Sequence, residues 1–245
     1  MSATSTSSTS TPIRPVRRLG HRLSGFAVAL GCVLFLGGFA WAALLYRPYT
    51  VPTDSMRPAI APGDKVLAQK VSGSAVHRGD VVVFKDPLWG DLPEVKRVIG
   101  LGGDTVACCD RQGRLTVDGK PVTEPYLENG GDPASASRFS TTVPRGKLFL
   151  LGDNRQVSQD SRVHLDDAEH GAVPASDVRG RVAATAWPLG QAGMSSRTSA
   201  FDRLPGGGAA SGGPLPWSFA MVVAGVVLIL GGAAYEPVAK LVRRR

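Results

Sequence analysis

The stretch TVPTDSMRPA, residues 50–59, holds a serine and a methionine between two prolines, shortly after a long apolar run. A serine hydroxyl attacks nothing at neutral pH unless a neighbouring group takes its proton. Ser55 is therefore a candidate nucleophile, and the chemistry depends on a base elsewhere in the chain.

Histidine is the commonest general base, and the chain has four. His21 lies on the basic side of the first apolar run, and His77 lies in a turn-like stretch, AVHRGD. His164 and His170 flank HLDDAEH, a pattern typical of a solvated surface loop. Because its acids could complete a triad, a Ser–His hydrolase stays an alternative.

Lysine is the other candidate base, because an amine among apolar groups loses the solvation that favours its charged form. Lys65, Lys70, Lys85 and Lys96 all lie in or near strand-like stretches. Lys96 lies in the apolar stretch EVKRVIG, but spacing alone does not separate it from Lys85 in VVVFKD. For each of them, a surface lysine on a strand is the plain alternative.

Six segments occur in a fixed order over roughly residues 25–189. They are PTDSMRPAIAPGD (52–64), GDVVVFKDP (79–87), VKRVIGLGGDTV (95–106), VDGKPVTEPYL (117–127), GDNRQVSQDSR (152–162) and VRGRV (178–182). Together they resemble the bacterial type I signal peptidases of peptidase family S26. These are membrane-anchored serine–lysine endopeptidases that remove signal peptides from exported proteins. A Ser-Met pair alone is a weak signal, whereas the ordered set is a strong one.

The resemblance implies a role for each matching residue. Ser55 would be the nucleophile, and Lys96 the general base that later protonates the leaving amine. The Thr53 hydroxyl and the Ser55 N–H would donate to the oxyanion, each contributing about 2.7–4 kcal/mol in comparable sites. Ser158 matches the serine that orients the lysine. The resemblance implies no cofactor and no metal.

Five further residues match positions around this site. Met56 would line or support the nucleophile region. Asp153 and Asn154 would shape a turn, and Asp160 and Arg162 would form a supporting ion pair. Because GDN is a common turn and an Asp–Arg pair can be purely structural, we expect the last four to act first as scaffold.

The chain departs from the family pattern in three places. Gly102 in GLGGD replaces the usual proline, which predicts a looser turn. After DSR, the segment RVHLDDAEHGAVP delays the next glycine to Gly171, so the shape of this loop is open. A C-terminal helix occurs in only some members. None of these differences falls on the proposed Ser–Lys pair.

Two uncharged apolar runs, residues 24–46 and 215–235, flank these segments. Each can cross a hydrocarbon core of roughly 30 Å as a helix, and aromatic residues lie near the ends of both. The first exceeds the roughly 7–15 apolar residues of a cleaved signal. The second has a Gly/Ser/Pro-rich lead-in and ends in LVRRR. We therefore predict two transmembrane helices.

The charge distribution predicts their orientation. The two tails, residues 1–23 and 236–245, hold 8 of the 28 Lys/Arg and 1 of the 20 Asp/Glu. The rest therefore has 20 basic and 19 acidic residues, a net charge of +1. Basic flanks stay cytoplasmic, so both tails should be cytoplasmic. The pI of 9.8 thus reflects topology and indicates no nucleic-acid partner.

Between the helices, short Val-, Leu- and Thr-rich segments bounded by Gly, Asp and Pro predict strands, and VDGK at 117–120 predicts a tight hairpin turn. We therefore predict a mainly β chain, in which an extracytoplasmic peptidase domain (47–189) forms an antiparallel barrel or sandwich-like core. Residues 190–214 are predicted to be a flexible linker and residues 1–12 to be disordered.

The three cysteines add little. Cys32 lies within the first apolar run and is expected to pack there. Cys108 and Cys109 are adjacent, which is poor geometry for a disulfide and too few ligands for zinc. A strained vicinal disulfide and a pair of free thiols both stay open.

Ser55 lies nine residues beyond Tyr46, at most about 30 Å even in an extended chain. The nucleophile should therefore act near the outer membrane surface, where small residues one and three positions before the cut would be selected by shallow pockets. The expected partners are preprotein signal peptides, membrane lipid and the secretion translocon.

Three rival interpretations compete with the signal peptidase interpretation. A non-catalytic, membrane-anchored β module would bind a secretion partner without Ser55 or Lys96 chemistry. A cytosolic Ser–Lys autoprotease shares the dyad, but the two predicted transmembrane helices exclude it. A peptidase specialised for pilus subunits or for one export client would keep the same motifs, so the sequence does not separate it from a general signal peptidase.

Overall fold

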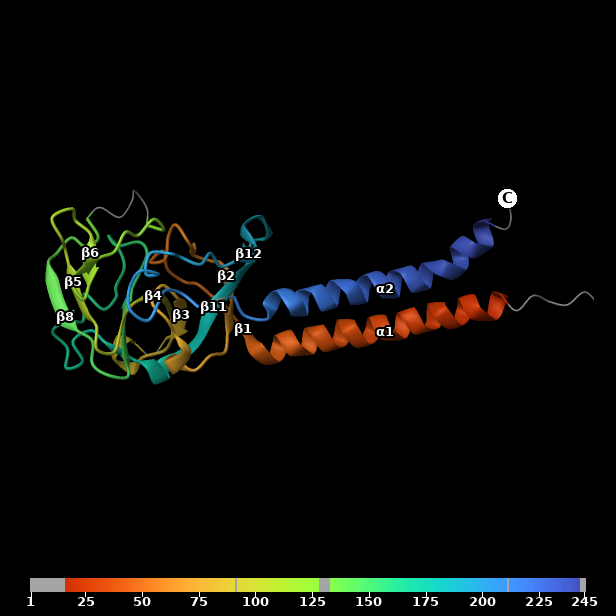
Figure 1. The fold of residues 1–245 in the computed structure, drawn as a ribbon, viewed down its shortest axis with the longest axis horizontal. Helices are drawn as coiled ribbons and strands as arrows, with labels where there is room; N and C mark the ends of the chain where they lie inside the picture. The colour runs from red at the N-terminus through yellow and green to blue at the C-terminus, as the bar shows by residue number, and fades with distance from the viewer. Residues whose placement is uncertain (1–15, 91, 128–132, 211, 243–245) are drawn as a thin grey trace, which may run out of the picture. The chain divides into compact units, whose positions relative to one another are not determined.

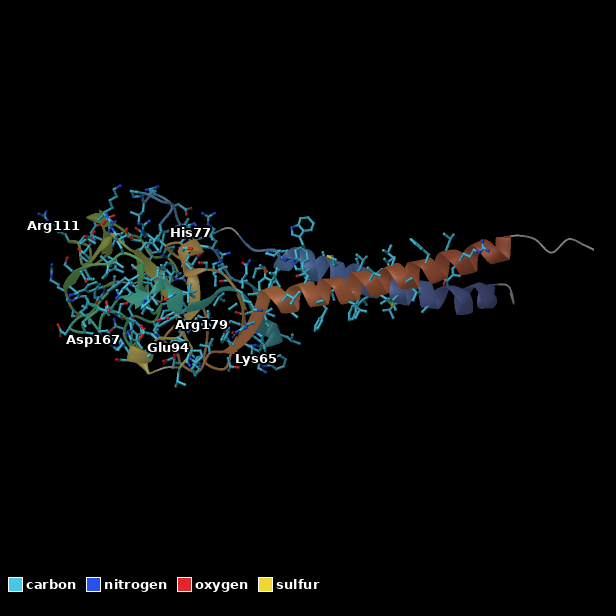
Figure 2. All side chains as sticks on the ribbon, turned by 90° about the horizontal axis from the view of Figure 1, so that it is seen from below. Lys65, His77, Glu94, Arg111, Asp167 and Arg179 are labelled. Atoms are coloured by element: carbon cyan, nitrogen blue, oxygen red, sulfur yellow. A yellow bond between two sulfur atoms is a disulfide. The ribbon has the colours of Figure 1, made fainter. Side chains whose placement is uncertain are left out.

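The computed structural model describes residues 16–90, 92–127, 133–210 and 212–242. The chain forms two compact units, one containing two long helices and the other spanning residues 43–215. In Figure 2, side chains along the helices are mostly carbon, whereas nitrogen and oxygen gather on the other unit. The disorder predicted for residues 1–12 lies outside the described residues, as do the last three arginines of the basic tail.

The helical unit contains α1 (Val16–Leu45) and α2 (Leu215–Val242). Within them, Arg22–Leu45 and Leu215–Tyr235 are long and apolar enough to cross a membrane. Small residues line the contact between the helices: a Cβ on Gly31 would lie 2.9 Å from the Gly225 oxygen. Ser24 Oγ donates to the Gly232 oxygen at 2.8 Å. Such residues let apolar helices approach closely.

The larger sheet of the second unit follows the order β1-β2-β11-β3-β4-β9-β10, and β12 pairs with β11 (Figure 1). All of these pairs are antiparallel. The strands are β1 (Tyr46–Thr50), β2 (Lys65–Gln69), β3 (Val81–Phe84), β4 (Glu94–Leu101), β9 (Lys147–Leu151), β10 (Val173–Pro174), β11 (Val178–Trp187) and β12 (Gly193–Met194).

The smaller sheet follows the order β7-β6-β5-β8, again antiparallel. Its strands are β5 (Thr105–Cys108), β6 (Leu115–Val117), β7 (Lys120–Pro121) and β8 (Phe139–Thr142). Asp118 and Gly119 have φ of 50° and 72° between β6 and β7, so the predicted VDGK turn is confirmed. A disulfide joins Cys108 to Cys109. The mainly antiparallel β prediction is confirmed.

Short 3₁₀ turns complete the unit. They are η1 (Gly73–Ala75), η2 (Pro87–Trp89), η4 (Ala175–Asp177) and η5 (Leu189–Gln191). Asp86 begins η2 by accepting a hydrogen bond from the Leu88 N–H, the usual role of a capping aspartate.

The centre of the larger sheet is covered on both faces. All four residues of β3 are buried, and they alternate between two apolar clusters. Val81 and Val83 pack with Met56, whereas Val82 and Phe84 pack in the other cluster. Because successive residues of a strand point to opposite faces, the neighbours Lys96 and Arg97 on β4 are buried on opposite sides.

The described residues of 190–214, for which the composition predicts a flexible linker, make specific contacts with the β unit. Phe201 is fully buried with the apolar core around the smaller sheet. Arg78 donates to the Pro205 oxygen at 2.6 Å, and the Ala210 N–H donates to Asp80 at 2.9 Å. The Gly-rich composition conceals these anchors, which fasten the described part of the segment to the β unit.

Candidate active site

Ser55 lies in the loop between β1 and β2, which is closed at its base. The Val51 N–H donates to the Asp64 oxygen at 2.9 Å, and the Gly63 N–H donates back to the Val51 oxygen at 2.8 Å. Met56 has no exposed surface and anchors the loop in the apolar core. The structure thus places Met56, directly after Ser55, in the apolar core.

Ser55 meets Thr53 and Lys96 at this loop. Lys96 Nζ donates to Ser55 Oγ at 3.3 Å, and Thr53 Oγ1 lies 3.1 Å from the same oxygen. Ser55 is 5% exposed and Lys96 is 3% exposed. Lys96 Nζ also donates to Glu94 Oε2, at 2.8 Å. The structure thus brings together the predicted nucleophile, base and hydroxyl donor, and adds a carboxylate.

The segment after β9 holds the nucleophile loop from the other side. The Asn154 N–H donates to the Ser55 carbonyl oxygen at 2.9 Å, and Asn154 Nδ2 donates to the Asp54 oxygen at 3.3 Å. Gly152 is required here, because a Cβ would lie 2.5 Å from the Ser55 oxygen and collide with Ser158 Oγ. Asn154 therefore supports the nucleophile backbone directly.

Ser158 is near the site without the contact that the resemblance implied. It is buried, and its N–H donates to the Asn154 oxygen at 3.0 Å. Its Oγ is also buried and has no hydrogen-bond partner among the described residues. The orienting bond from Ser158 to Lys96 is thus not formed in this structure.

Asp160 and Arg162 form an ion pair, with Arg162 Nε and Nη2 each 2.8 Å from a carboxylate oxygen. Asp160 is fully buried and also accepts from the Gly152 N–H at 3.0 Å. Arg162 Nη2 continues to the Arg155 oxygen at 2.9 Å. The pair therefore contacts the backbone on both sides of Asn154, through the Gly152 N–H and the Arg155 oxygen.

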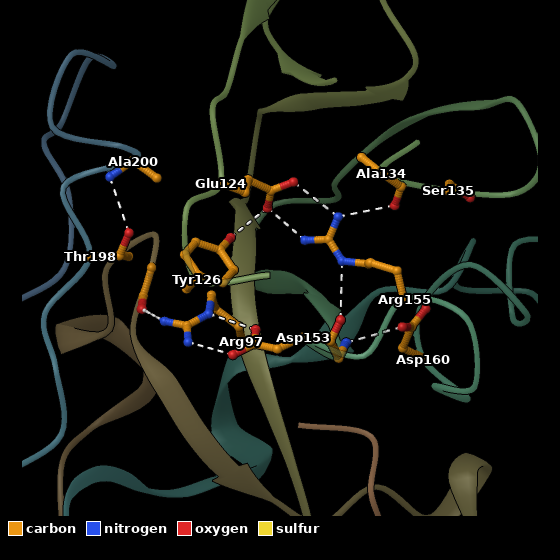
Figure 3. Close-up of polar contacts among 12 residues, drawn as sticks. Arg97, Glu124, Tyr126, Ala134, Ser135, Asp153, Arg155, Asp160, Thr198 and Ala200 are labelled. Carbon is orange, nitrogen blue, oxygen red and sulfur yellow. Dashed lines mark hydrogen bonds and ion pairs between the residues drawn. The ribbon is translucent and has the colours of Figure 1, made fainter. Parts of the chain in front are cut away.

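A buried ionic network lies beside the site (Figure 3). Arg97 binds Asp153 through two bonds of 2.8 and 2.6 Å, with its guanidinium 4.0 Å from the Tyr126 ring centroid. Arg155 binds Glu124 in the same bidentate manner, at 3.0 and 2.6 Å. Tyr126 donates its hydroxyl to Glu124 as well.

The network keeps its arginines charged. Burial alone would lower the pKa of Arg97, but Asp153, together with Tyr126 and Glu124, raises it above its ordinary value. Glu124 raises the pKa of Arg155 in the same way, again against burial. Burial also raises the pKa of the Tyr126 phenol well above its ordinary value. Tyr126 is thus a neutral donor at physiological pH.

Sequence reasoning missed several members of this site. Arg97 and Arg155 lie inside the quoted motifs, directly beside Lys96 and Asn154, but nothing local pairs them with Glu124 or Tyr126. Glu94 carried a usable signal. It precedes Lys96 by two residues on a strand, and such residues share a face.

The histidines do not support a Ser–His arrangement. His164 Nδ1 lies 2.8 Å from Asp167, and its ring stacks on Trp89. His170 Nδ1 lies near the Leu165 oxygen. None of the three histidines whose side chains are described, His77 included, is hydrogen-bonded to Ser55. In the described part of the chain, no group of three or more His, Cys, Asp or Glu residues could hold a metal.

Comparison with known proteins gives a consistent result. Residues 23–187 match the family described as signal peptidase, peptidase S26. The signal peptidase I of Mycobacterium tuberculosis (strain H37Rv) is 32% identical over 232 residues, which cover 74% of this chain and 77% of that protein. Signal peptidase IB of Staphylococcus aureus (strain COL) is 32% identical over 182 residues, covering 67% and 87%.

Two further comparisons cover less of the chain. The signal peptidase I of Bacillus licheniformis is 40% identical over 129 residues, which cover 49% of this chain and 68% of that protein. The crystal structure of a signal peptidase I from Enterococcus faecalis V583 has 30% sequence identity, with a TM-score of 0.34. That match covers 42% of this chain and 93% of the other, and the TM-score is too low to support an argument about fold.

Proposed function

This chain belongs to the signal peptidase family, peptidase S26, and from that premise we propose that Ser55 and Lys96 cut signal peptides from exported preproteins. Membership makes the protein a serine endopeptidase that processes signal peptides. The assignment of the dyad rests on one observation, the 3.3 Å contact between Lys96 Nζ and Ser55 Oγ at a buried position.

In the proposed reaction, Ser55 Oγ attacks the scissile carbonyl carbon while an unprotonated Lys96 Nζ takes the hydroxyl proton. The Ser55 N–H and the Thr53 hydroxyl donate to the oxyanion that forms, and such preorganised donors lower the barrier most. The Lys96 ammonium then protonates the departing amine, which leaves an ester on Ser55. A water, deprotonated by Lys96, releases the signal peptide and restores the serine.

The proposed specificity is for small residues one and three positions before the cut, as in Ala-x-Ala. Two features support a shallow site. Met56 is fully buried next to Ser55, and even a Cβ on Gly152 would lie only 2.5 Å from the Ser55 carbonyl oxygen. A larger substrate side chain would have to displace buried groups, which disfavours it.

We further propose that α1 and α2 span the plasma membrane, with both termini cytoplasmic and the β unit on the outer side. Their length and apolar composition support spanning, and the arginines that precede the apolar run of α1 and those that follow α2 support this orientation. Lipid would then be a permanent partner, and the secretion translocon would be a transient one that delivers the preprotein.

The decisive experiment measures cleavage of a preprotein with an Ala-x-Ala site, in detergent or lipid. Wild type is compared with Ser55→Ala and Lys96→Ala, and Lys85→Ala is the control, because Lys85 directly follows the neighbouring strand β3. We expect only the first two variants to be inactive. Cleavage by Lys96→Ala would place the base elsewhere, and a wild type that cuts nothing would favour a binding module.

A further inference from the structure

Lys96 Nζ has two partners, and the nearer one is not the nucleophile. Glu94 Oε2 lies 2.8 Å away, whereas Ser55 Oγ lies 3.3 Å away. Glu94 and Lys96 are two residues apart on β4 and therefore share a face of the strand. The Glu94 side chain is 28% exposed and that of Lys96 is 3% exposed. The carboxylate can thus reach solvent, and the amine cannot easily do so.

This contact conflicts with the role of a base. A carboxylate at this distance favours the charged form of a lysine. An ammonium has three N–H donors and no lone pair, so it cannot accept the Ser55 proton. The arrangement in the free enzyme therefore has to change before the first chemical step, whatever substrate binds.

We propose that Glu94 is a positioning residue that holds Lys96 as a resting ammonium in the free enzyme and releases it when substrate occupies the site. The proposal rests on the Ser55–Lys96 dyad proposed above. On release, the proton leaves Nζ for solvent by way of the Glu94 carboxylate, which is the exposed member of the pair. The neutral amine then faces Ser55 Oγ.

Ser158 supplies the second half of this arrangement. Its buried Oγ lacks a hydrogen-bond partner among the described residues, which is unfavourable for a buried hydroxyl. It also borders the nucleophile, because a Cβ on Gly152 would touch both Ser158 Oγ and the Ser55 carbonyl oxygen. A neutral hydroxyl is a suitable partner for a neutral amine. Lys96 can therefore exchange Glu94 for Ser158 while keeping its place beside Ser55.

The other carboxylates near Lys96 either pair with arginines or are exposed. Opposite Lys96, β3 presents Val82, which is apolar. The segment after β9 carries Asp153 and Asp160, which bind Arg97 and Arg162. Asp54 in the nucleophile loop is exposed. In the described residues, Glu94 is therefore the carboxylate paired with Lys96.

The test is the pH dependence of cleavage of the Ala-x-Ala preprotein by wild type, Glu94→Gln and Glu94→Ala. The profile of kcat/KM reports the free enzyme, and that of kcat reports the substrate complex. We expect both variants to shift the acid limb of kcat/KM to lower pH, because they remove the carboxylate that contacts Lys96 Nζ. The kcat limb should hardly move, because substrate has already displaced Glu94.

Glu169→Gln is the matched control, because it removes the carboxylate from another Lys–Glu pair, with Lys147, away from the dyad. Its profiles should match wild type. Superimposable kcat/KM profiles for Glu94→Gln and wild type, with Lys96→Ala inactive, would overturn the role of Glu94 and leave the dyad intact. Loss of activity at every pH, restored by Glu94→Asp, would also overturn it by making Glu94 essential. An active Lys96→Ala would instead refute the dyad.

Discussion

Lys96 and Arg97 are neighbours on β4, yet the two faces they occupy are built in opposite ways. Arg97 is fully engaged, by Asp153, by the Gly79 oxygen and by the Tyr126 ring. On the other face, Lys96 divides its amine between two partners, and Ser158 Oγ has none among the described residues. Polar groups with all their hydrogen bonds formed, as around Arg97, hold the backbone in place. Polar groups that lack a partner, as around Lys96, allow hydrogen bonds to be exchanged during a reaction.

The two faces are also mechanically linked. Asp153 binds Arg97, and the next residue, Asn154, holds the Ser55 carbonyl. Arg155 donates to the Gly152 oxygen at 3.1 Å and ties the same turn to Glu124. The side that carries Arg97 therefore positions the loop that holds Ser55, and the side that carries Lys96 is where we propose the chemistry occurs. This division can be tested from both directions.

The largest effect should come from Arg155→Met. The change leaves the Glu124 carboxylate buried without its bidentate partner, and breaking a buried pair in this way typically costs about 3–5 kcal/mol. We expect the free energy of unfolding, measured by urea titration in detergent, to fall by this amount. The exposed Arg111→Met is the control and should change it little. A loss below about 1 kcal/mol would show that the network is not a structural support.

On the side that carries Lys96, Thr53→Val should affect activity and leave stability unchanged. Thr53 is exposed, and valine keeps its shape while removing the hydroxyl that lies 3.1 Å from Ser55 Oγ. Loss of one oxyanion donor lowers kcat by about 10²–10³-fold. Single-turnover cleavage of the preprotein would measure this, and Thr53→Ser should retain activity. Equal loss in the serine variant would assign Thr53 a packing role.

The contrast between the two faces explains what the sequence could predict. The apolar runs, the VDGK turn and the antiparallel strands follow from local patterns, because each depends on residues a few positions apart. Ser55, Thr53 and Lys96 came from motifs, and the structure brings them within hydrogen-bond distance. Their roles in catalysis stay a prediction.

Features that join distant segments were not predictable in this way. Arg155 and Glu124 are 31 residues apart, and no local pattern in either segment indicates that the two side chains pair. The same holds for Phe201, whose burial depends on a core built by other strands. The sequence shows that Gly31 and Gly225 are small residues within apolar runs. Their contact could not be predicted, because the sequence does not show that the two helices pack together.

A smaller effect is expected for Ser158→Ala. The variant removes an unpartnered buried hydroxyl, so the free energy of unfolding should stay constant or rise. If Ser158 Oγ forms a hydrogen bond with Lys96 Nζ during the reaction, the variant should lower kcat by about fivefold. This factor is equivalent to the loss of one hydrogen bond of about 1 kcal/mol. Preprotein cleavage and urea unfolding give the two values. A clear loss of stability would mean that the hydroxyl is bonded in the resting fold.

The smallest effect should come from Tyr126→Phe, on the side that carries Arg97. Phenylalanine keeps the ring over Arg97, and Glu124 keeps Arg155, so only the bond from the phenol is lost. At neutral pH this should lower the free energy of unfolding by about 0.5 kcal/mol.

The pH dependence of Tyr126→Phe gives a sharper signature than its size. Burial raises the pKa of Tyr126 in the folded state well above the ordinary value of 10.0. The folded protein therefore holds this proton more tightly than the unfolded chain. Its contribution to stability is complete below pH 10 and is lost as the pH rises toward the folded-state pKa. Wild type should thus lose stability on this alkaline limb, and Tyr126→Phe should lose less, as unfolding titrations at several pH values would show. If wild type and Tyr126→Phe lose the same free energy of unfolding as the pH rises, the phenol is solvated. The hydrogen bonds around Tyr126 would then be no more saturated than those around Lys96.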